Sequence, residues 1–225
     1  MQTKLALTGL ALTLACAPAT AAAAKPTIPP PTNAAITIEA KPAITIFSGT
    51  STLSGRVSGA KAGALVRLEQ DDTRPYGDSY KPAAGTATVA ANGKYTFTVK
   101  PLLNTQYRAV AQASPPVTSA GTLVRVRILV GSKLSDSTPR RGSLVRFSGT
   151  VFPAHDGRTV SIQRRTPSGS FVTVARTTLR DAGATSSKYS RRVRVSRDGV
   201  YRVKVTGDGD HLSGYSRLRA VTVHG

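Results

Sequence analysis

A pattern of tyrosines and apolar residues recurs at a spacing of 94 positions, and this repeat limits the possible folds more than any other feature. Tyr95 returns as Tyr189, and Tyr107 returns as Tyr201. Glycines and apolar residues across 53–108 return at the same spacing without a net gap. Self-similarity at a fixed period indicates duplication of one structural unit. The chain is therefore predicted to contain two copies of one small domain.

Each copy has about seven short segments in which apolar and polar residues alternate, as in Ile44-Thr45-Ile46. Alternation with a period of two is typical of half-buried strands. Turn-forming pairs such as Asn92-Gly93 separate the segments. Pro42 interrupts the first strand, which predicts an edge strand that breaks and switches sheets. The predicted fold class is all-β, with two tandem seven-stranded β-sandwiches.

Two positions depart from the repeat. At 94 positions Val126 falls on Ala220, and a one-residue insertion that aligns it with Val221 restores the alternation. Phe97, which should point inward, corresponds to Arg191. A buried unpaired arginine is costly, so either its side chain extends into solvent or a bulge shifts the register. We favour extension into solvent.

The segment Asp198-Gly199-Val200-Tyr201-Arg202-Val203 resembles the start of the F strand in immunoglobulin-like domains. In that family a tyrosine hydroxyl pins the corner between neighbouring strands, which implies a strand-corner role for Tyr107 and Tyr201. Two residues later, where antibody domains have a disulfide cysteine, this chain has Ala109 and Val203. Both copies therefore resemble the disulfide-free bacterial immunoglobulin-like and fibronectin-type-III-like modules, which occur as tandem repeats in secreted and surface proteins.

The N-terminal region predicts export. Residues 1–24 have a positive start, an apolar core and an alanine-rich end, the organisation of a secretory signal peptide. Residues 25–34 form a proline-rich leader, which predicts an extended spacer. The two sandwiches are predicted at 35–127 and 128–225. We expect an extracellular or cell-surface protein with no transmembrane helix after signal removal.

Cys16 is the only cysteine and lies inside the predicted signal. Two fates are open for it: removal with the signal near Ala24, or attachment of a lipid as in bacterial lipoproteins. Ala15 suits lipid attachment, but Thr13 stands where a branched aliphatic residue is usual. We favour removal, which leaves the mature chain without a disulfide or a thiolate metal site.

Positive charge is concentrated in the second copy. Residues 25–123 carry 10 basic and 5 acidic residues, whereas residues 124–225 carry 20 and 6. Such a surface attracts polyanions such as wall polymers or acidic polysaccharides, although a basic surface can also serve only solubility. Because side chains alternate along strands, five basic residues are predicted to line one face of one sheet. They are Lys188, Arg192, Arg194, Arg202 and Lys204.

Catalytic and metal-binding patterns are weak. No Gly-x-Ser-x-Gly elbow and no phosphate-binding glycine motif occurs, so we expect a non-enzymatic protein without a cofactor. Asp208 and Asp210 are the best metal candidates, because closely spaced loop aspartates can bind calcium. Their run lacks the closing glutamate of a calcium loop, and Asp and Gly are common in turns. We interpret it as a turn and predict no metal.

The predicted function is a spacer, adhesion or binding module at the cell surface. One alternative is a polyanion-binding protein that uses the basic sheet of the second copy. Another is a carbohydrate-binding module with Tyr76, Tyr80 and Tyr215 as exposed aromatic contacts. The chain has no tryptophan, and the series of exposed aromatics typical of single-stranded nucleic-acid sites is not evident. We therefore expect no specific nucleic-acid partner.

Overall fold

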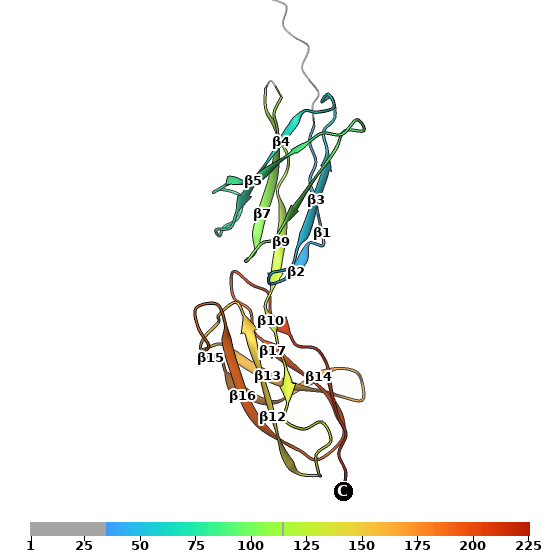
Figure 1. Ribbon diagram of the computed structural model, residues 1–225, viewed down its shortest axis with the longest axis vertical. Helices are drawn as coiled ribbons and strands as arrows, with labels where there is room; N and C mark the ends of the chain where they lie inside the picture. The colour runs from blue at the N-terminus through green and yellow to red at the C-terminus, as the bar shows by residue number, and fades with distance from the viewer. Residues whose placement is uncertain (1–34, 114) are drawn as a thin grey trace, which may run out of the picture. The chain divides into compact units, whose positions relative to one another are not determined.

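The computed structural model describes residues 35–113 and 115–225 (Figure 1). The predicted signal peptide 1–24, the leader 25–34 and Cys16 lie outside the described residues. Every helix or strand element of the described part is a β-strand, which confirms the all-β prediction. Within residues 35–113 and 115–225 there is no helix with the length and apolar character needed to cross a membrane.

The first half contains a three-stranded sheet in the order β1-β3-β6 and a six-stranded sheet in the order β2-β9-β7-β4-β5, with β8 pairing to β7. The strands are β1 (Glu39–Lys41), β2 (Ile44–Ile46), β3 (Ser51–Arg56), β4 (Leu65–Asp71), β5 (Lys81–Thr88), β6 (Lys94–Val99), β7 (Thr105–Ala111), β8 (Val117–Thr118) and β9 (Thr122–Arg127).

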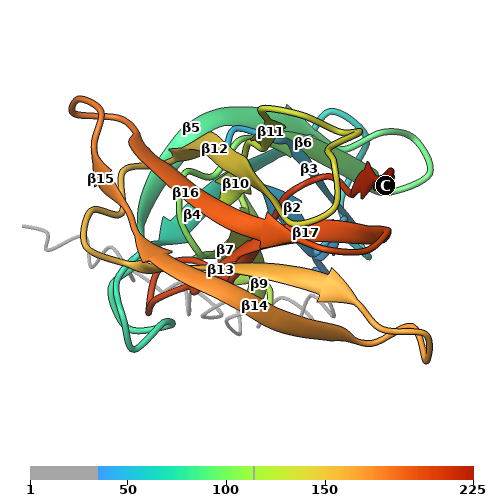
Figure 2. The same ribbon diagram turned by 90° about the horizontal axis from the view of Figure 1, so that it is seen from below.

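The second half contains two five-stranded sheets. One has the order β10-β12-β16-β15 with β11 on β12, and the other β14-β13-β17-β18 with β19 on β17 (Figure 2). The strands are β10 (Leu129–Val130), β11 (Lys133–Leu134), β12 (Ser143–Phe152), β13 (Thr159–Arg165), β14 (Phe171–Thr178), β15 (Arg180–Asp181), β16 (Ser187–Val195), β17 (Gly199–Val205), β18 (Gly214–Tyr215) and β19 (Arg219–Val221).

The first strand of the chain changes sheets at Pro42. β1 pairs antiparallel with β3, whereas β2 pairs parallel with β9 of the other sheet. Proline has no N–H to donate to a ladder, so it is tolerated where pairing with one sheet ends and pairing with another begins. The prediction of an edge strand that breaks and switches sheets is confirmed.

Each half has its own hydrophobic core, to which both of its sheets contribute. In the first half Leu53 and Phe97 come from one sheet and Val66 from the other. In the second half Phe147 and Val203 come from opposite sheets in the same way. Apolar side chains on alternate positions of both sheets are thus removed from water together. This arrangement is consistent with the predicted β-sandwiches.

A duplicated tyrosine contact holds an edge segment onto its own sheet at equivalent places in the two halves. The hydroxyl of Tyr95 donates a hydrogen bond to the backbone carbonyl of Thr37. The hydroxyl of Tyr189 donates to the carbonyl of Gly131 over 2.8 Å. Thr37 and Gly131 are 94 positions apart, as the two tyrosines are. The repeat found in the sequence is therefore also a repeat of buried polar contacts.

Tyr107 and Tyr201 occupy equivalent positions on β7 and β17 and are only 3% and 4% exposed. Burial raises the pKa of the Tyr107 phenol to about 12. The Tyr201 ring packs on Phe147 with a centroid separation of 5.3 Å. Both residues are core side chains, and their predicted strand-corner role stays a prediction.

Replacing Tyr189 with phenylalanine is expected to lower the free energy of unfolding by about 1 kcal/mol, because the part-buried hydrogen bond from its hydroxyl to the carbonyl of Gly131 is lost. Tyr95→Phe should have a similar effect through Thr37. Tyr215→Phe is the matched control, since Tyr215 is 38% exposed. Urea unfolding measures all three changes, and an unchanged midpoint for Tyr189→Phe would show that the hydroxyl contributes nothing.

Arg191 is exposed, although alternate residues on either side of it in β16, Tyr189 and Val193, are buried. It pairs with Phe147, and the register between β12 and β16 runs unbroken from Ser143↔Val195 to Val151↔Ser187. No bulge occurs along this pairing, so the predicted extension of the side chain into solvent is confirmed. A long arginine stem achieves this without moving the backbone.

The predicted one-residue insertion before the last strand is wrong. Tyr107 pairs with Thr122, and the equivalent Tyr201 pairs with Arg219. Thr122 and Arg219 are 97 positions apart, three more than the repeat spacing. Side chains alternate with a period of two, so insertions of one and three residues give the same apolar pattern. Only the pairing of the strands distinguishes a one-residue insertion from a three-residue insertion.

Candidate functional site

The predicted basic stripe is divided between two sheets. β16, which carries Lys188, Arg192 and Arg194, pairs with β12 and β15. β17, which carries Arg202 and Lys204, pairs with β13, β18 and β19 in the other sheet. The short connection 196–198 crosses between sheets rather than forming a hairpin. The prediction that all five side chains share one face is therefore wrong.

The outer face of the β10-β12-β16-β15 sheet brings like charges directly opposite each other. Arg146 on β12 faces Arg192 on β16, and Lys188 on β16 faces Arg180 on β15. Among the described residues, no ion pair joins any of these four side chains to a carboxylate. Like charges at directly opposed positions destabilise a sheet. An anion bound to this face would relieve that repulsion.

A groove of about 1130 Å³ adjoins this face. None of the described residues that line the groove is acidic, and five are basic. The basic residues are Lys133, Arg180, Lys188, Arg217 and Arg219. Of the predicted contact residues, Lys188 alone lines the groove, while Arg192 and Arg194 lie further along the same strand.

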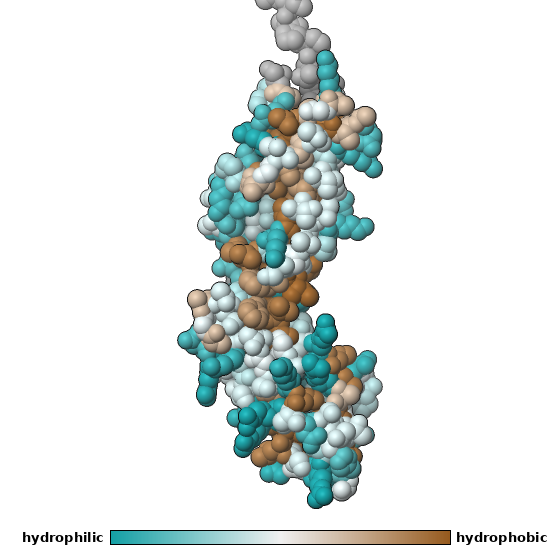
Figure 3. Space-filling view, in the orientation of Figure 1, coloured by the Kyte–Doolittle hydropathy of each residue, from teal (hydrophilic) through white to brown (hydrophobic). Residues whose placement is uncertain are grey.

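The groove also has apolar lining. Ile46, Leu129 and Tyr215 line it and are 51%, 40% and 38% exposed. Figure 3 shows a brown, apolar area over the region where Figure 1 labels β2 and β10, bordered by teal side chains. An exposed apolar patch beside cations suits a ligand that carries both anionic groups and a carbon backbone.

One of the cations is held in place. The Arg219 guanidinium donates through Nη2 to the carbonyl of Ser132, which also lines the groove. Its Nε atom is buried and makes no hydrogen bond to any described residue. A buried unpaired donor is costly, so an acceptor from a ligand would stabilise this position.

Arg202 and Lys204, which belong to the other sheet, both lie near the ring of Tyr215, and Tyr215 lines the groove. The Arg202 guanidinium carbon lies 4.5 Å from the centroid of Tyr215 and 3.8 Å from that of Phe171. The Lys204 Nζ atom lies 6.0 Å from the Tyr215 centroid. Tyr215, one of the aromatic contacts proposed from the sequence, is therefore shared between the groove and these cations.

One pair of equivalent contacts differs in charge between the two halves. Arg108 Nε donates to the Glu69 carboxylate over 2.7 Å. At the equivalent positions Arg202 Nε donates to the side-chain carbonyl of Gln163 over 2.9 Å. The geometry of the contact is preserved, but the acid is replaced by a neutral amide. The charge of Arg202 is consequently uncompensated at this contact.

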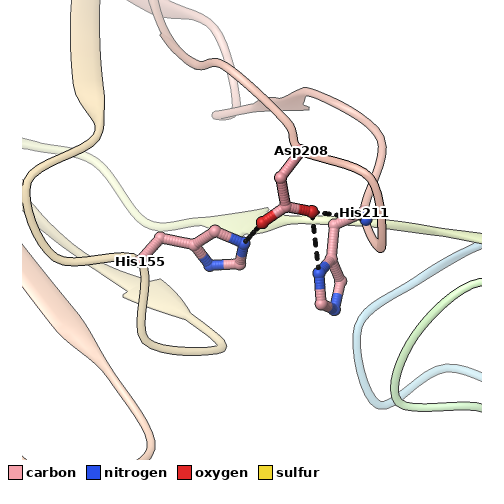
Figure 4. A group of neighbouring side chains, drawn as sticks. All are labelled: His155, Asp208 and His211. Carbon is pink, nitrogen blue, oxygen red and sulfur yellow. Dashed lines mark hydrogen bonds and ion pairs between the residues drawn. The ribbon is translucent and has the colours of Figure 1, made fainter.

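A second cluster of functional groups lies in the loops of the second half (Figure 4). His155 is in the β12–β13 loop, and Asp208 and His211 are in the β17–β18 loop. His155 Nε2 lies 3.0 Å from Asp208 Oδ2, and His211 Nδ1 lies 3.4 Å from Asp208 Oδ1. Both histidines are 8% exposed. The three ligand atoms lie within 4.8 Å of one another, a grouping that could hold a metal ion.

The Asp208 carboxylate is charged in this setting. Burial by itself acts to raise the pKa of Asp208, but hydrogen bonds from the backbone N–H groups of His211 and Asp210 and the neighbouring imidazoles lower that pKa below its usual range. These N–H bonds to Oδ1, of 2.7 and 2.9 Å, form the turn that the sequence indicated. Asp210 is exposed and stands outside the group of three.

The sequence prediction did not connect His155 with His211, because 56 positions separate them and no local motif links them. It likewise missed Lys133, Arg180, Arg217 and Arg219 as groove residues. These four belong to short strands or loops whose position depends on the pairing of distant segments. The excess of basic residues in the second half was the only signal that pointed toward them.

Comparison with known proteins gives a limited result. No protein-family model matches the chain, and no curated protein matches it. A solved tetra-tandem repeat from the extending region of a large adhesion protein is similar over 84% of this chain and 49% of that one, at 21% identity and a TM-score of 0.35. Red sea bream transglutaminase is similar over 85% of this chain and 31% of that one, at 13% identity and a TM-score of 0.40. The chain thus spans less than half the length of either.

Proposed function

We propose that the chain is a non-enzymatic exported module of two tandem immunoglobulin-like sandwiches, divided near residue 127, that acts at the cell surface as an adhesion or spacer element by binding a polyanionic polymer. The observation that carries the proposal is the groove beside β10 and β12, which has five basic lining residues and no acidic one among the described residues. The polymer class proposed is an acidic wall polymer or acidic polysaccharide.

The chemistry of the groove supports this ligand class. Arginine presents a planar fork of donors that matches phosphate and carboxylate oxygens, and Arg180, Arg217 and Arg219 are available for such contacts. Exposed apolar side chains beside them suit the carbon skeleton of a polymer unit. Because the cations are solvent-exposed, binding is expected to weaken steeply as salt concentration rises.

Neutral carbohydrate recognition has less support. Arg108 covers the Tyr80 ring at 3.9 Å from its centroid. The hydroxyl of Tyr76 is buried. Of the three aromatic contacts considered from the sequence, Tyr215 is the one that lines the groove. A single exposed tyrosine beside several cations favours an anionic polymer over a neutral sugar platform.

The proposal predicts that charge reversal in the groove abolishes polymer binding. The double variant Arg180→Glu/Lys188→Glu should bind polyglycerol phosphate at least about thirtyfold more weakly at low salt, since each basic side chain near a polyanion contributes about 1 kcal/mol. The matched control is Arg176→Glu/Arg197→Glu, which has the same net charge but changes exposed residues outside the groove. Equal losses in both variants would contradict a localised site.

A further inference from the structure

We propose that His155, Asp208 and His211 bind a divalent transition-metal ion of the zinc class. The inference is independent of the polymer-binding groove, because none of the three residues lines it. Each side chain offers one ligand atom, these atoms lie within 4.8 Å of one another, and both rings turn a nitrogen toward the Asp208 carboxylate (Figure 4).

Hydrogen bonding on the outer side of each ring determines which nitrogen carries a proton. His155 Nδ1 lies 2.9 Å from the carbonyl oxygen of Pro153, and His211 Nε2 lies 2.9 Å from that of Leu102. A carbonyl oxygen only accepts, so both outer nitrogens must be N–H donors. When the rings are neutral, as metal binding requires, the inner nitrogens His155 Nε2 and His211 Nδ1 carry the lone pairs.

The two inner nitrogens point at a carboxylate. The inner nitrogens face Asp208 oxygens at 3.0 and 3.4 Å, and His211 Nδ1 is buried without a hydrogen bond to any described residue. The positive charge that this arrangement needs is supplied either by protons on the inner nitrogens or by a metal ion that replaces them. Histidine ligands of metals commonly donate the outer N–H to a backbone carbonyl, as both do here. A dication therefore satisfies all three groups, and the outer bonds have already oriented the rings.

The ligand set selects the kind of ion. Two imidazole nitrogens and one carboxylate suit zinc and its neighbours, whereas calcium requires six or more oxygen ligands. Tetrahedral zinc with bonds of about 2.0–2.1 Å places its ligand atoms about 3.3 Å apart. The two nitrogen–oxygen distances of 3.0 and 3.4 Å run to different oxygens of Asp208. Since the three ligand atoms lie within 4.8 Å of one another, the side chains must move closer together to share one ion. Three protein ligands leave the fourth position open for water.

One neighbouring cation acts against the ion. Arg158 Nη2 lies 3.8 Å from Asp208 Oδ2, and Nη1 of the same residue donates to the carbonyl of Gly207. The Arg158 side chain is 44% exposed, so it is free to turn toward solvent when a metal binds. Asp156, the other nearby acid, accepts from the Ser187 hydroxyl over 2.6 Å and takes no part in the cluster. Arg158→Gln is expected to strengthen metal binding severalfold.

Metal binding would also stiffen a contact between the halves of the chain. The 207–211 loop receives the Asn104 backbone N–H at the carbonyl of Asp210 over 2.8 Å, and His211 donates to Leu102. Leu102 and Asn104 belong to the β6–β7 loop of the first half. Fixing Asp208 and His211 on one ion restrains the loop that makes these bonds, so protease cleavage near 207–211 should slow when zinc is added.

Zinc titration of the full chain by calorimetry at neutral pH tests the site. One Zn²⁺ per chain is expected, with little response to Ca²⁺. His155→Gln and His211→Gln should each weaken zinc binding at least about tenfold. The controls are His224→Gln, which changes the one histidine outside the cluster, and Asp210→Asn, which changes the neighbouring acid; both should bind as the unchanged chain does.

A spectroscopic measurement on the unchanged chain tests the site without relying on variants that fail to fold. Cobalt(II) bound by the unchanged chain should give the intense visible absorption of tetrahedral coordination, and an equivalent of zinc should remove it. Absence of zinc binding by the folded, unchanged chain would overturn the proposal. So would binding that persists in both ring variants or disappears with His224→Gln, since either result places the metal elsewhere.

Discussion

Phe147→Ala is expected to lower the free energy of unfolding by about 3–5 kcal/mol, the range for removing a buried phenylalanine from a packed core. Phe147 is 0% exposed and lies in the core of the second half beside Tyr201. Truncation removes its ring and leaves a cavity that strands paired on both sides are poorly able to close. Urea unfolding followed by circular dichroism measures the loss.

Leu144→Ala is the control in the same strand. Leu144 is 54% exposed on the outer face of β12, so its removal should change the unfolding free energy by less than about 0.5 kcal/mol. If both variants lost the same stability, the assignment of inner and outer faces in β12 would be wrong. The core and the neighbouring basic face would then both need revision.

Asp71→Asn is expected to lower the free energy of unfolding by roughly 2–4 kcal/mol. Asp71 is 0% exposed and organises the loop after β4. Its Oδ1 accepts the backbone N–H of Thr73, and its Oδ2 accepts those of Gly77, Asp78 and Ser79. An amide has one acceptor oxygen and presents its own N–H groups to these donors, so several bonds are lost at once.

The same contacts determine how stability depends on pH. Burial acts to raise the pKa of Asp71, but the four backbone hydrogen bonds favour the charged form and bring that pKa below its usual value. A carboxylate with a lower pKa in the folded state stabilises the fold above its unfolded pKa, about 3.9, and loses that contribution as pH falls through the folded value. Unfolding measured from pH 7 to acid should therefore show a decline that is smaller in Asp71→Asn.

Asp72→Asn separates this effect from a general loss of charge. Asp72 forms an exposed ion pair with Lys81 at 2.8 Å, and such pairs contribute about 1 kcal/mol or less. The variant should keep the acid dependence of the unchanged chain. If Asp72→Asn and Asp71→Asn had equal effects, the buried hydrogen bonds of Asp71 would not be the cause.

The parts of the fold that could be predicted from the sequence are those that depend on local pattern. Alternation identified the strands, and the 94-residue repeat survives as the matched hydroxyl bonds of Tyr95 and Tyr189. Pro42 was correctly placed at a sheet switch because its missing N–H acts locally. These inferences rest on the covalent structure of proline and on the two-residue alternation of side chains along a strand, and both can be read directly from the order of the residues.

What could not be predicted depends on which distant segments pair. Whether β16 and β17 form a hairpin or cross between sheets is undetermined by alternation, because the inner and outer positions are the same in either case. The three-residue insertion before β19 escaped detection for the same reason. The grouping of His155 with Asp208 depends on two loops meeting, and the closely spaced aspartates of the 207–211 loop do not by themselves indicate His155 as a partner.

Lysine acetylation footprinting of the protein with bound polyglycerol phosphate tests the central claim most directly. Lys133 and Lys188 line the groove, whereas Lys61 and Lys94 are exposed in the first half. Polymer should slow acetylation of Lys133 and Lys188 at low salt, leave Lys61 and Lys94 unchanged, and lose this protection at high salt. Bound polymer that leaves Lys133 and Lys188 as reactive as before, or protects all four lysines equally, would contradict a polyanion site in this groove.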